Sequence, residues 1–550
     1  MIIGSGRPQI RSTVVVLAIA ALMVAGAVTV VARTTIAEAA ADRVAAAALV
    51  EDDGADCAVS VPGSSPANSR LPDPFRKLDG TRITTKSDWR CRRAEIKELA
   101  ERSVYGDKPA KPASVTGTVS NSGITVNVSH NGRSASFSAS VQLPSGTGPF
   151  PAVVVLGGFG ADTATIRAAG AAVISYDPLA VGREGTPRNN KQGAFYTIYG
   201  ATSSTGLLVA WAWGVSRIID VIEQSGGNIL RPDATGVTGC SRYGKGAFVI
   251  GAFDQRIALT MPIESGSAGA PIFRGIPGES GSQPLSSAYG EQPWLGDAFG
   301  SFTGNPTTLP VDTHETVAMI APRGLLIMEN PHIDWLAARS GSVAALAGAE
   351  VYKALGAGDN ITYWSDVQDG THCASRPEWR TPLQQYIQEF LLKTGNAPGA
   401  MRISSRKLGN LAEWREWQTP TLTDGPTTPP TTPPTTPPTT PPTTPPTTPP
   451  TTSPTGCTAT VSLNQWTGGF VATVRVAAGS APVNGWTVTM TLPSGARVTN
   501  AWNASGSGTT GTVQFANAGH NGAIAAGQST EFGFQGTGTG TGMSPTCAAR

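Results

Sequence analysis

The pattern of apolar and polar positions separates a long region of mixed helix and strand signals from a shorter region of strand signals alone. Short β-branched apolar runs predict buried strands at residues 150–160, 171–178, 234–241, 256–264 and 323–330. The apolar stretch 204–227 predicts a helix that Ser204 caps and a glycine ends. Strands that alternate with helices over 55–400 indicate an α/β domain with a mostly parallel, doubly wound sheet.

Beyond this domain the chain changes character twice. Residues 425–455 repeat the unit PTTP and contain nothing apolar to bury, which predicts an extended, O-glycosylated spacer of about 3.1 Å per residue. We place this Pro/Thr-rich linker at 419–456. Residues 457–547 show short strands and turns without a helical period, which predicts a small all-β sandwich.

The N-terminus has the layout of an export signal. Arg7 and Arg11 precede the apolar run 13–32, and small residues follow at 37–41. This order predicts a secretory signal peptide over 1–41, cleaved near Ala39 to Ala41. A run of about 20 apolar residues is also long enough for an uncleaved membrane anchor. Both alternatives place the rest of the chain outside the cytoplasm.

Charge and cysteine content narrow the class further. The chain has 40 Lys and Arg against 38 Asp and Glu, so a net charge of +2 gives no electrostatic case for nucleic acid. Its six cysteines favour disulfides in an exported protein, and their spacing suggests no metal site. Cys457 and Cys547 bracket the sandwich and are expected to pair, which leaves three pairings for the other four.

The stretch GVTGCSRYGKGA, residues 236–247, carries the candidate nucleophile. Ser241 stands between a predicted strand and a helix that starts near Gly244, which is the setting of a nucleophile elbow. Tyr243 occupies the last glycine position of the usual G-x-S-x-G pattern, and the glycine comes one residue late. An ordinary turn between strand and helix is therefore the alternative interpretation.

A serine nucleophile needs a base and an acid, which follow it in chain order in this class of sheet. His372 adjoins Cys373 as Ser241 adjoins Cys240, so a Cys240–Cys373 disulfide, with its Cα atoms within about 7 Å, would bring base and nucleophile together. That disulfide would leave Cys57 to pair with Cys91.

Two glutamates are candidates for the acid. Glu264 and Glu329 end successive predicted strands, at the carboxyl edge of the sheet where active sites gather. A solvated carboxylate at a strand end is the alternative for each of them.

Arg242 and Lys245 open the helix behind the serine. Cations are unfavourable at a helix N-terminus, so two of them together require a compensating anion. The Arg242 backbone N–H and guanidinium are candidates to stabilise an oxyanion. Lys245 lies one turn from Ser241 and is a candidate donor to a substrate oxygen. Solvated side chains are the alternative for both residues.

At these residues the sequence resembles a known family. The stretch GCSRYGKGA resembles the G-C-S-R-x-G-K-G signature of glucuronoyl esterases, carbohydrate esterase family 15, and the similarity runs over most of 55–400. The resemblance implies an α/β-hydrolase fold and cleavage of esters between 4-O-methyl-glucuronic acid of xylan and lignin alcohols. It also implies that no metal and no organic cofactor is used.

The resemblance assigns roles by position. Ser241 matches the nucleophile, His372 the base, Glu264 the triad acid and Arg242 the oxyanion arginine, with Glu329 as an alternative acid. The Cys240–Cys373 disulfide agrees with one expected in the family. The residues that match the family's sugar contacts are Lys245, Gln283, Glu291 and Trp335.

The C-terminal region resembles a family 2 carbohydrate-binding module, through stretches such as NQWTGGFVATVRV and NGWTVTMTLP. Exposed aromatic residues of such modules stack on successive sugar rings of cellulose or xylan. Trp466 and Trp502 match two of these positions, and Trp486 is interpreted as core. His520 stands at the third position, where an aromatic residue is expected, so weaker binding is expected.

We therefore expect a secreted, extracellular and monomeric serine esterase that acts on plant cell-wall polysaccharide, with no nucleic-acid partner and, if the signal is cleaved, no stable membrane partner. Two alternatives remain open. An acetyl-xylan or general carbohydrate esterase on the same fold would not need the four sugar-contact residues. A non-catalytic polysaccharide-binding protein would not need the serine, acid and histidine.

Overall fold

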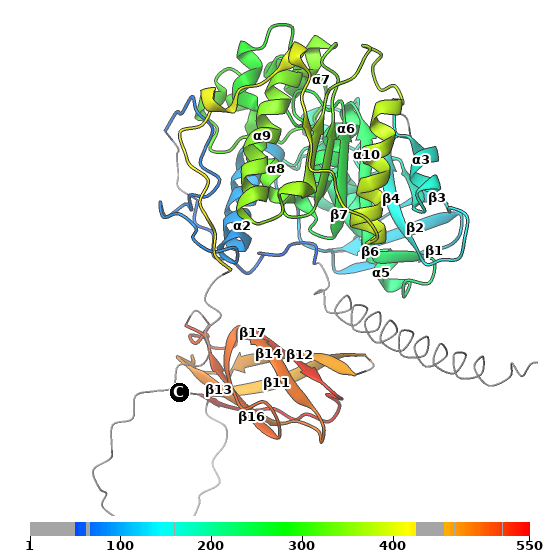
Figure 1. Cartoon of the computed structure of the whole chain (residues 1–550). Helices are drawn as coiled ribbons and strands as arrows, with labels where there is room; N and C mark the ends of the chain where they lie inside the picture. Colours follow the sequence, from blue (N-terminus) through cyan, green and yellow to red (C-terminus); the bar gives the residue numbers. More distant parts are fainter. Residues whose placement is uncertain are drawn as a thin grey trace, which may run out of the picture. The chain divides into compact units, whose positions relative to one another are not determined.

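The computed structural model describes residues 50–61, 66–158, 160–424, 456–466, 468–519 and 521–549. The chain divides into two compact units at Thr431 and Thr432, and each unit is described by itself (Figure 1). The predicted signal 1–41 and the repeat 425–455 lie outside the described residues. Within the described ranges, no helix combines the length and the apolar character needed to cross a membrane.

A ten-stranded sheet forms the centre of the first unit, in the order β1-β2-β3-β5-β4-β6-β7-β8-β9-β10. The first three strands are antiparallel and form one edge, and the strands from β5 to β10 run parallel to one another. The strands are β1 (Ser114–Val119), β2 (Gly123–His130), β3 (Arg133–Gln142), β4 (Phe150–Leu156), β5 (Ala172–Tyr176), β6 (Leu230–Cys240), β7 (Ile257–Ile263), β8 (Gly324–Met328), β9 (Ile361–Trp364) and β10 (Met401–Arg402).

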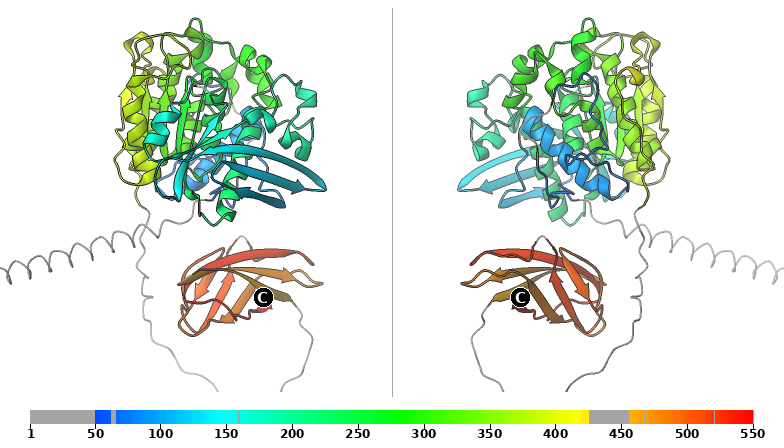
Figure 2. Two further views of the ribbon diagram at one scale, coloured as in Figure 1. Left: turned by 90° about the vertical axis from the view of Figure 1, so that its right-hand side faces the viewer. Right: turned by 90° about the vertical axis from the view of Figure 1, so that its left-hand side faces the viewer.

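Helices cover both faces of this sheet, as Figures 1 and 2 show. Side chains alternate along β4, so Val154 packs with one buried cluster and Val153 with the other. The first cluster includes helices α2, α5, α6, α8 and α9, and the second includes α3 and α10. The helices are α2 (Asp88–Ala100), α3 (Thr163–Ala168), α4 (Ala194–Tyr199), α5 (Leu207–Gln224), α6 (Arg242–Phe253), α7 (Leu285–Glu291), α8 (Thr313–Ile320), α9 (Ala338–Ala354) and α10 (Pro377–Ile387).

The five predicted strands correspond to β4, β5, β6, β7 and β8, which confirms the parallel α/β sheet. The predicted cap of the long helix was wrong. Helix α5 begins at Leu207 after Gly206, and no side chain caps it. The carbonyls of Pro293 and Trp294 instead accept from the first helical N–H groups of Leu207 and Leu208. Carbonyls from a distant segment thus take the place of a local serine.

The packing of the first unit continues past residue 400. Trp417 and Leu422 are buried in the first core cluster, and Thr423 forms a parallel bridge with Thr85. Glu51 is likewise paired with Lys108 of this unit. The described chain is therefore attached to the first unit as far as Asp424.

The second unit consists of two four-stranded antiparallel sheets, β11-β12-β17-β14 and β15-β16-β13-β18. Trp486 is fully buried between them and stacks on Phe532 at 5.2 Å, which confirms its predicted place in the core. Cys457 and Cys547 form the expected disulfide. The strands are β11 (Cys457–Trp466), β12 (Gly469–Ala478), β13 (Trp486–Thr491), β14 (Arg497–Trp502), β15 (Ala504–Ser507), β16 (Thr512–Asn517), β17 (Ser529–Thr537) and β18 (Thr546–Ala549).

The aromatic positions predicted to bind sugar are only partly described. Trp502 is 40% exposed at the end of β14 and lies against the backbone of Gly533. The side chain of Trp466 and the whole of His520 lie outside the described residues.

Candidate active site

Ser241 lies on a sharp turn between β6 and α6. Its φ of 59° is in the left-handed region, and its N–H donates to the carbonyl of Ile263 on the neighbouring strand. Helix α6 starts directly after it at Arg242, rather than near Gly244 as predicted, because Lys245 N–H already donates to the Ser241 carbonyl. The strained turn leaves the side chain of Ser241 partly exposed at the carboxyl edge of the sheet.

The glycine that comes one residue late has a packing reason. A Cβ atom on Gly244 would lie 2.4 Å from the carbonyl oxygen of Ile263, and one on Gly239 would lie 2.6 Å from that of Tyr243. Both positions therefore exclude a side chain. Glycine at these two positions allows α6 to pack closely against β7. The nucleophile elbow therefore forms although the sequence departs from the G-x-S-x-G pattern.

Glu264 and His372 are joined by a hydrogen bond. Nδ1 of His372, in the loop between β9 and α10, donates to Glu264 Oε2 at 2.7 Å. Glu264 is fully buried directly after β7, with a φ of 46°. This bond fixes the ring tautomer, with Nδ1 protonated and Nε2 free to accept a proton.

Other donors complete the environment of the Glu264 carboxylate. The Cys373 N–H donates to Oε2 at 2.7 Å, and Asn330 Nδ2 donates to Oε1 at 3.3 Å. The guanidinium of Arg376 lies 3.6 Å from Oε1. Donors and positive charge of this kind favour the ionised form of a buried carboxylate.

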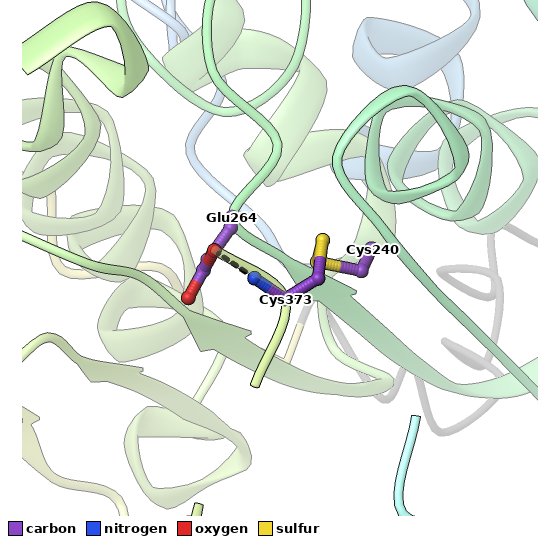
Figure 3. Close-up of side chains that lie close together, drawn as sticks. All are labelled: Cys240, Glu264 and Cys373. Carbon is purple, nitrogen blue, oxygen red and sulfur yellow. Dashed lines mark hydrogen bonds between the residues drawn. A yellow bond between two sulfur atoms is a disulfide. The ribbon is translucent and has the colours of Figure 1, made fainter. Parts of the chain in front are cut away.

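A disulfide connects the histidine loop to the serine turn. Cys240 and Cys373 are bonded, with their Cα atoms 5.8 Å apart, and Figure 3 shows this bond beside Glu264. Nε2 of His372 lies 3.7 Å from Cys373 Sγ, next to the strand end that carries Ser241. Among the described residues, the Ser241 hydroxyl forms no hydrogen bond with the ring. Such a catalytic contact is often loose before substrate binds.

The second predicted acid is in a different state. Glu329 directly follows β8 and is fully buried, and its Oε2 has no hydrogen-bond partner. Burial, together with the negative charge of Glu264, raises the pKa of Glu329 well above its usual value. Burial therefore disfavours the ionised form of Glu329, whereas Glu264 is the carboxylate to which the histidine is bonded.

The predicted sugar contacts line one open cleft of about 430 Å³. Gln283 Nε2 donates to Glu291 Oε2 at 2.8 Å, and the Gln283 N–H donates to the Trp335 carbonyl. The Trp335 side chain is 52% exposed, and its ring meets that of His372 edge to face at 5.9 Å. Lining the cleft are Ser241, Arg242, Lys245, Gly266, Gly281, Ser282, Gln283, Pro284, Glu291, Trp294, Trp335 and Leu336.

Lys245 is the buried cation of the cleft. Its ammonium group donates to the carbonyl of Ser265 at 2.5 Å and lies 5.3 Å from the centre of the Trp294 ring. Burial lowers the pKa of Lys245 to about 8, although Glu291 and Glu329 raise it in part. The group thus titrates close to neutrality.

The anion that the sequence required beside Arg242 is Glu184. Its Oε2 accepts from Arg242 Nη1 at 2.8 Å, and its Oε1 accepts from the Trp294 indole at 2.6 Å. Neither Glu184 nor Trp294 was found by the sequence analysis. The sequence pointed to Glu184 only indirectly, because the unbalanced positive charge at the start of α6 required an anion. It did not show which acidic residue would supply that charge.

One cluster has the side-chain types of a metal site. Ligand atoms of Cys240, Cys373 and Glu264 lie within 4.8 Å of one another (Figure 3). Both sulfur atoms are joined in the disulfide, and the carboxylate is occupied by His372 and Cys373. Since a metal binds the thiolate form of cysteine, this cluster does not fit a metal ion.

A nucleophile turn after one parallel strand, an acid after the next and a histidine in a later loop define the α/β-hydrolase class of fold. Comparison with known proteins gives the family. The family model for fungal glucuronyl esterases matches residues 126–356. The 4-O-methyl-glucuronoyl methylesterase of Neurospora crassa is 40% identical over 372 residues, which are 66% of this chain and 93% of that protein. This chain belongs to the glucuronoyl esterases, carbohydrate esterase family 15.

Solved structures of glucuronoyl esterases support the same family assignment. The catalytic domain of the Hypocrea jecorina glucuronoyl esterase has a TM-score of 0.62 at 36% identity, and covers 66% of this chain with all of its own length. A serine-to-alanine mutant of the Sporotrichum thermophile glucuronoyl esterase, in complex with methyl 4-O-methyl-β-D-glucopyranuronate, has a TM-score of 0.63 at 38% identity, with coverage of 66% and 99%. Residues 457–549 match the family model for cellulose binding domains, so the second unit is a family 2 module.

Proposed function

We propose that this protein is a secreted serine esterase that hydrolyses the ester between 4-O-methyl-glucuronic acid of glucuronoxylan and lignin alcohols. The observation that carries the proposal is the bond of His372 to Glu264 in a loop that the Cys240–Cys373 disulfide ties to Ser241. Its relatives are named for the hydrolysis of the methyl ester of this same uronic acid.

In the proposed reaction, Ser241 Oγ attacks the uronoyl carbonyl while Nε2 of His372 takes its proton. Glu264 holds the ring through Nδ1 and stabilises the imidazolium that forms. The Arg242 backbone N–H and guanidinium stabilise the oxyanion. The alcohol leaves with the proton from His372, and a water molecule then releases glucuronate from the acyl-enzyme by the same base.

Four residues of the cleft hold the uronate ring. Lys245, Gln283 and Glu291 offer one cation, one amide and one carboxylate to its hydroxyl and ether oxygens, and Trp335 offers an exposed apolar ring to its C–H face. A polar set of this size on one wall of the cleft suits a uronate better than an acetyl group.

The second unit attaches the enzyme to cellulose or xylan. Trp502 is exposed as a stacking surface, in a module whose family model is that of cellulose binding domains. Cleavage of the signal within 1–41, a Pro/Thr linker that begins after Asp424 rather than at 419, and action as a monomer complete the proposal. The linker would let the esterase unit search the surface around the attached module.

The test compares benzyl glucuronate with acetylated xylan as substrates of the purified chain. We expect hydrolysis of the glucuronate ester, its loss in Ser241→Ala, and little release of acetate. Alanine replacements of Lys245, Gln283, Glu291 and Trp335 should raise KM for the glucuronate ester. Preferential deacetylation, or unaltered turnover in these four variants, would contradict the proposed substrate.

A further inference from the structure

The contacts of Glu184 raise a question about the reaction itself. Arg242 and Lys245 both lie in the first turn of α6, where the helix dipole already makes the potential positive. Two cations at this point repel each other, so a nearby anion is needed to balance their charge. The side chain of Arg242 is 41% exposed, so packing alone does not hold it.

Both carboxylate oxygens of Glu184 are used, each by a residue of the cleft. Oε2 accepts from Arg242 Nη1 at 2.8 Å, and Oε1 accepts from Trp294 Nε1 at 2.6 Å. The Glu184 side chain is only 10% exposed. A charged hydrogen bond of this length from a largely buried carboxylate fixes one edge of the guanidinium.

Trp294 supports the same arrangement from beneath. Its ring is buried, with Arg242 Cζ 5.9 Å and Lys245 Nζ 5.3 Å from the ring centre. The indole N–H is held by Glu184, so the bond fixes the orientation of a ring that lies near both cations. Glu184 therefore determines the place of the arginine both directly and through this ring.

The loop that carries Glu184 is itself anchored to the wall of the cleft. Gly185 N–H donates to Gln292 Oε1 at 2.6 Å, and Arg188 donates to the carbonyls of Tyr289 and Leu295. The arginine also stacks on the Tyr289 ring at 3.5 Å. Glu184 thus projects from a segment that cannot shift without moving the wall that bears Glu291.

From these contacts we propose that Glu184 is a positioning residue, which fixes the Arg242 guanidinium beside Ser241 for stabilisation of the oxyanion. This role rests on the proposed function. An oxyanion donor contributes most when its place is set before the charge develops. Removal of Glu184 therefore weakens the transition state more than the bound substrate, and the loss is expected in kcat rather than in KM.

The experiment is a double-mutant cycle with Glu184→Gln and Arg242→Ala, measured on a methyl glucuronate ester. Glutamine keeps the size of the side chain and removes its charge. We expect Glu184→Gln to lower kcat about tenfold with little change in KM, a part of the 10²- to 10³-fold loss typical of a whole oxyanion donor. In the Arg242→Ala background the same change should have almost no further effect, because the group it positions is gone.

A matched control removes another carboxylate that is paired with an arginine. Glu223, 3.2 Å from Arg256, lies outside the cleft, so Glu223→Gln should leave kcat unchanged. A kcat for Glu184→Gln equal to wild type, a loss confined to KM, or an equal loss in both Arg242 backgrounds would overturn the positioning role. Should Glu184→Gln fail to fold, Glu184→Asp takes its place in the double-mutant cycle. Aspartate keeps the charge, but its shorter side chain moves the carboxylate away from the Arg242 guanidinium.

A second substrate separates this inference from the function on which it rests. 4-Nitrophenyl acetate reports the Ser241 chemistry without the uronate contacts. Coupling between Glu184 and Arg242 on this ester, together with no activity on the glucuronate ester, would support the positioning role and reject the proposed substrate. Activity on both esters without coupling would reject the positioning role alone.

Discussion

At the scale of single residues, two buried glutamates a strand apart have different surroundings. Glu264 is surrounded by the His372 ring, the Cys373 N–H and the Arg376 guanidinium, all of which favour a negative charge. Glu329 has an oxygen without a partner and the charge of Glu264 nearby, which favour the neutral acid. Both glutamates lie at strand ends, so this position does not distinguish them. The hydrogen-bond donors around each carboxyl group do.

Substitution of the two glutamates by glutamine should give unequal results. Glu264→Gln removes the charge that orients and stabilises the imidazolium, so we expect kcat to fall by about 10⁴-fold. Glu329→Gln places a neutral amide of the same shape where burial already disfavours the charged carboxylate, so it should retain a kcat close to wild type. Steady-state kinetics on a methyl glucuronate ester measures both, and a larger loss in Glu329→Gln would contradict the assignment.

Substrate affinity should depend on pH through Lys245. Its pKa of about 8 means that the ammonium group loses its charge as the pH rises through 8, so KM for the glucuronate ester should increase above that pH. In Lys245→Met, KM should be high and independent of pH across the same range. A KM profile that is flat in the wild type would be the contrary result.

Stability should respond to the same group in the opposite sense. The unfolded chain keeps the lysine proton up to pH 10.5, the ordinary value, whereas the folded protein releases it near 8. Between these values the unfolded state binds more protons, so Lys245 makes the free energy of unfolding rise with pH. Urea unfolding of wild type and Lys245→Met at pH 7.5 and 9.5 measures this difference.

At the scale of elements, the site depends on how neighbouring strands end. Strands β6, β7 and β8 are adjacent in the sheet, and Ser241, Glu264 and Glu329 follow them directly. Parallel strands end at the same edge, so the pairing of these strands in the sheet is enough to bring the three residues together. His372 is different, because it lies on a loop before α10, and the Cys240–Cys373 disulfide ties that loop to β6.

Loss of this disulfide should affect both stability and catalysis. Its cysteines are 133 residues apart, so chain entropy predicts a loss of about 5 kcal/mol in Cys240→Ala/Cys373→Ala, together with a lower kcat because the histidine loop is released. The matched control is Cys57→Ala/Cys91→Ala, which opens a loop of 34 residues and should cost about 4 kcal/mol with kcat unchanged. Equal effects of the two pairs on kcat would contradict the role of the first.

At the scale of the whole molecule, the two units have separate cores. Residues of the second unit form their own buried cluster, and the described part of the first unit ends with Leu422 and Thr423 packed on its own helices and loops. Each unit thus has the internal contacts to fold alone. Catalysis and attachment to polysaccharide should accordingly be separable.

A chain that ends at Asp424 should test this separation. We expect it to keep the wild-type kcat on a soluble methyl ester and to lose retention on cellulose. In the full chain, Trp502→Ala should weaken cellulose binding about tenfold, since it removes one stacking surface. Trp335→Ala, which replaces an even more exposed tryptophan of the first unit, should leave cellulose binding unchanged although it raises KM. A loss of kcat on truncation would argue for interdependent units.

The sequence by itself determined much of this protein. Apolar runs located the strands β4 to β8, and the strand, serine and glycine pattern located the elbow at Ser241. The six cysteines paired as expected. The linker separates Cys457 and Cys547 from the other four, and the positions of Cys240 and Cys373 next to Ser241 and His372 suggested the second pair. These features are local or periodic, so they leave a direct trace in the order of residues.

Only the tertiary structure decided the partners of the buried charges. The cap of α5 comes from the carbonyls of Pro293 and Trp294, and the anion for Arg242 comes from Glu184, 58 residues earlier in the chain. The choice between Glu264 and Glu329 likewise followed from the donors around each carboxyl. Contacts of this kind depend on which loops the fold brings together. The order of residues in the sequence does not show which distant loops will be neighbours.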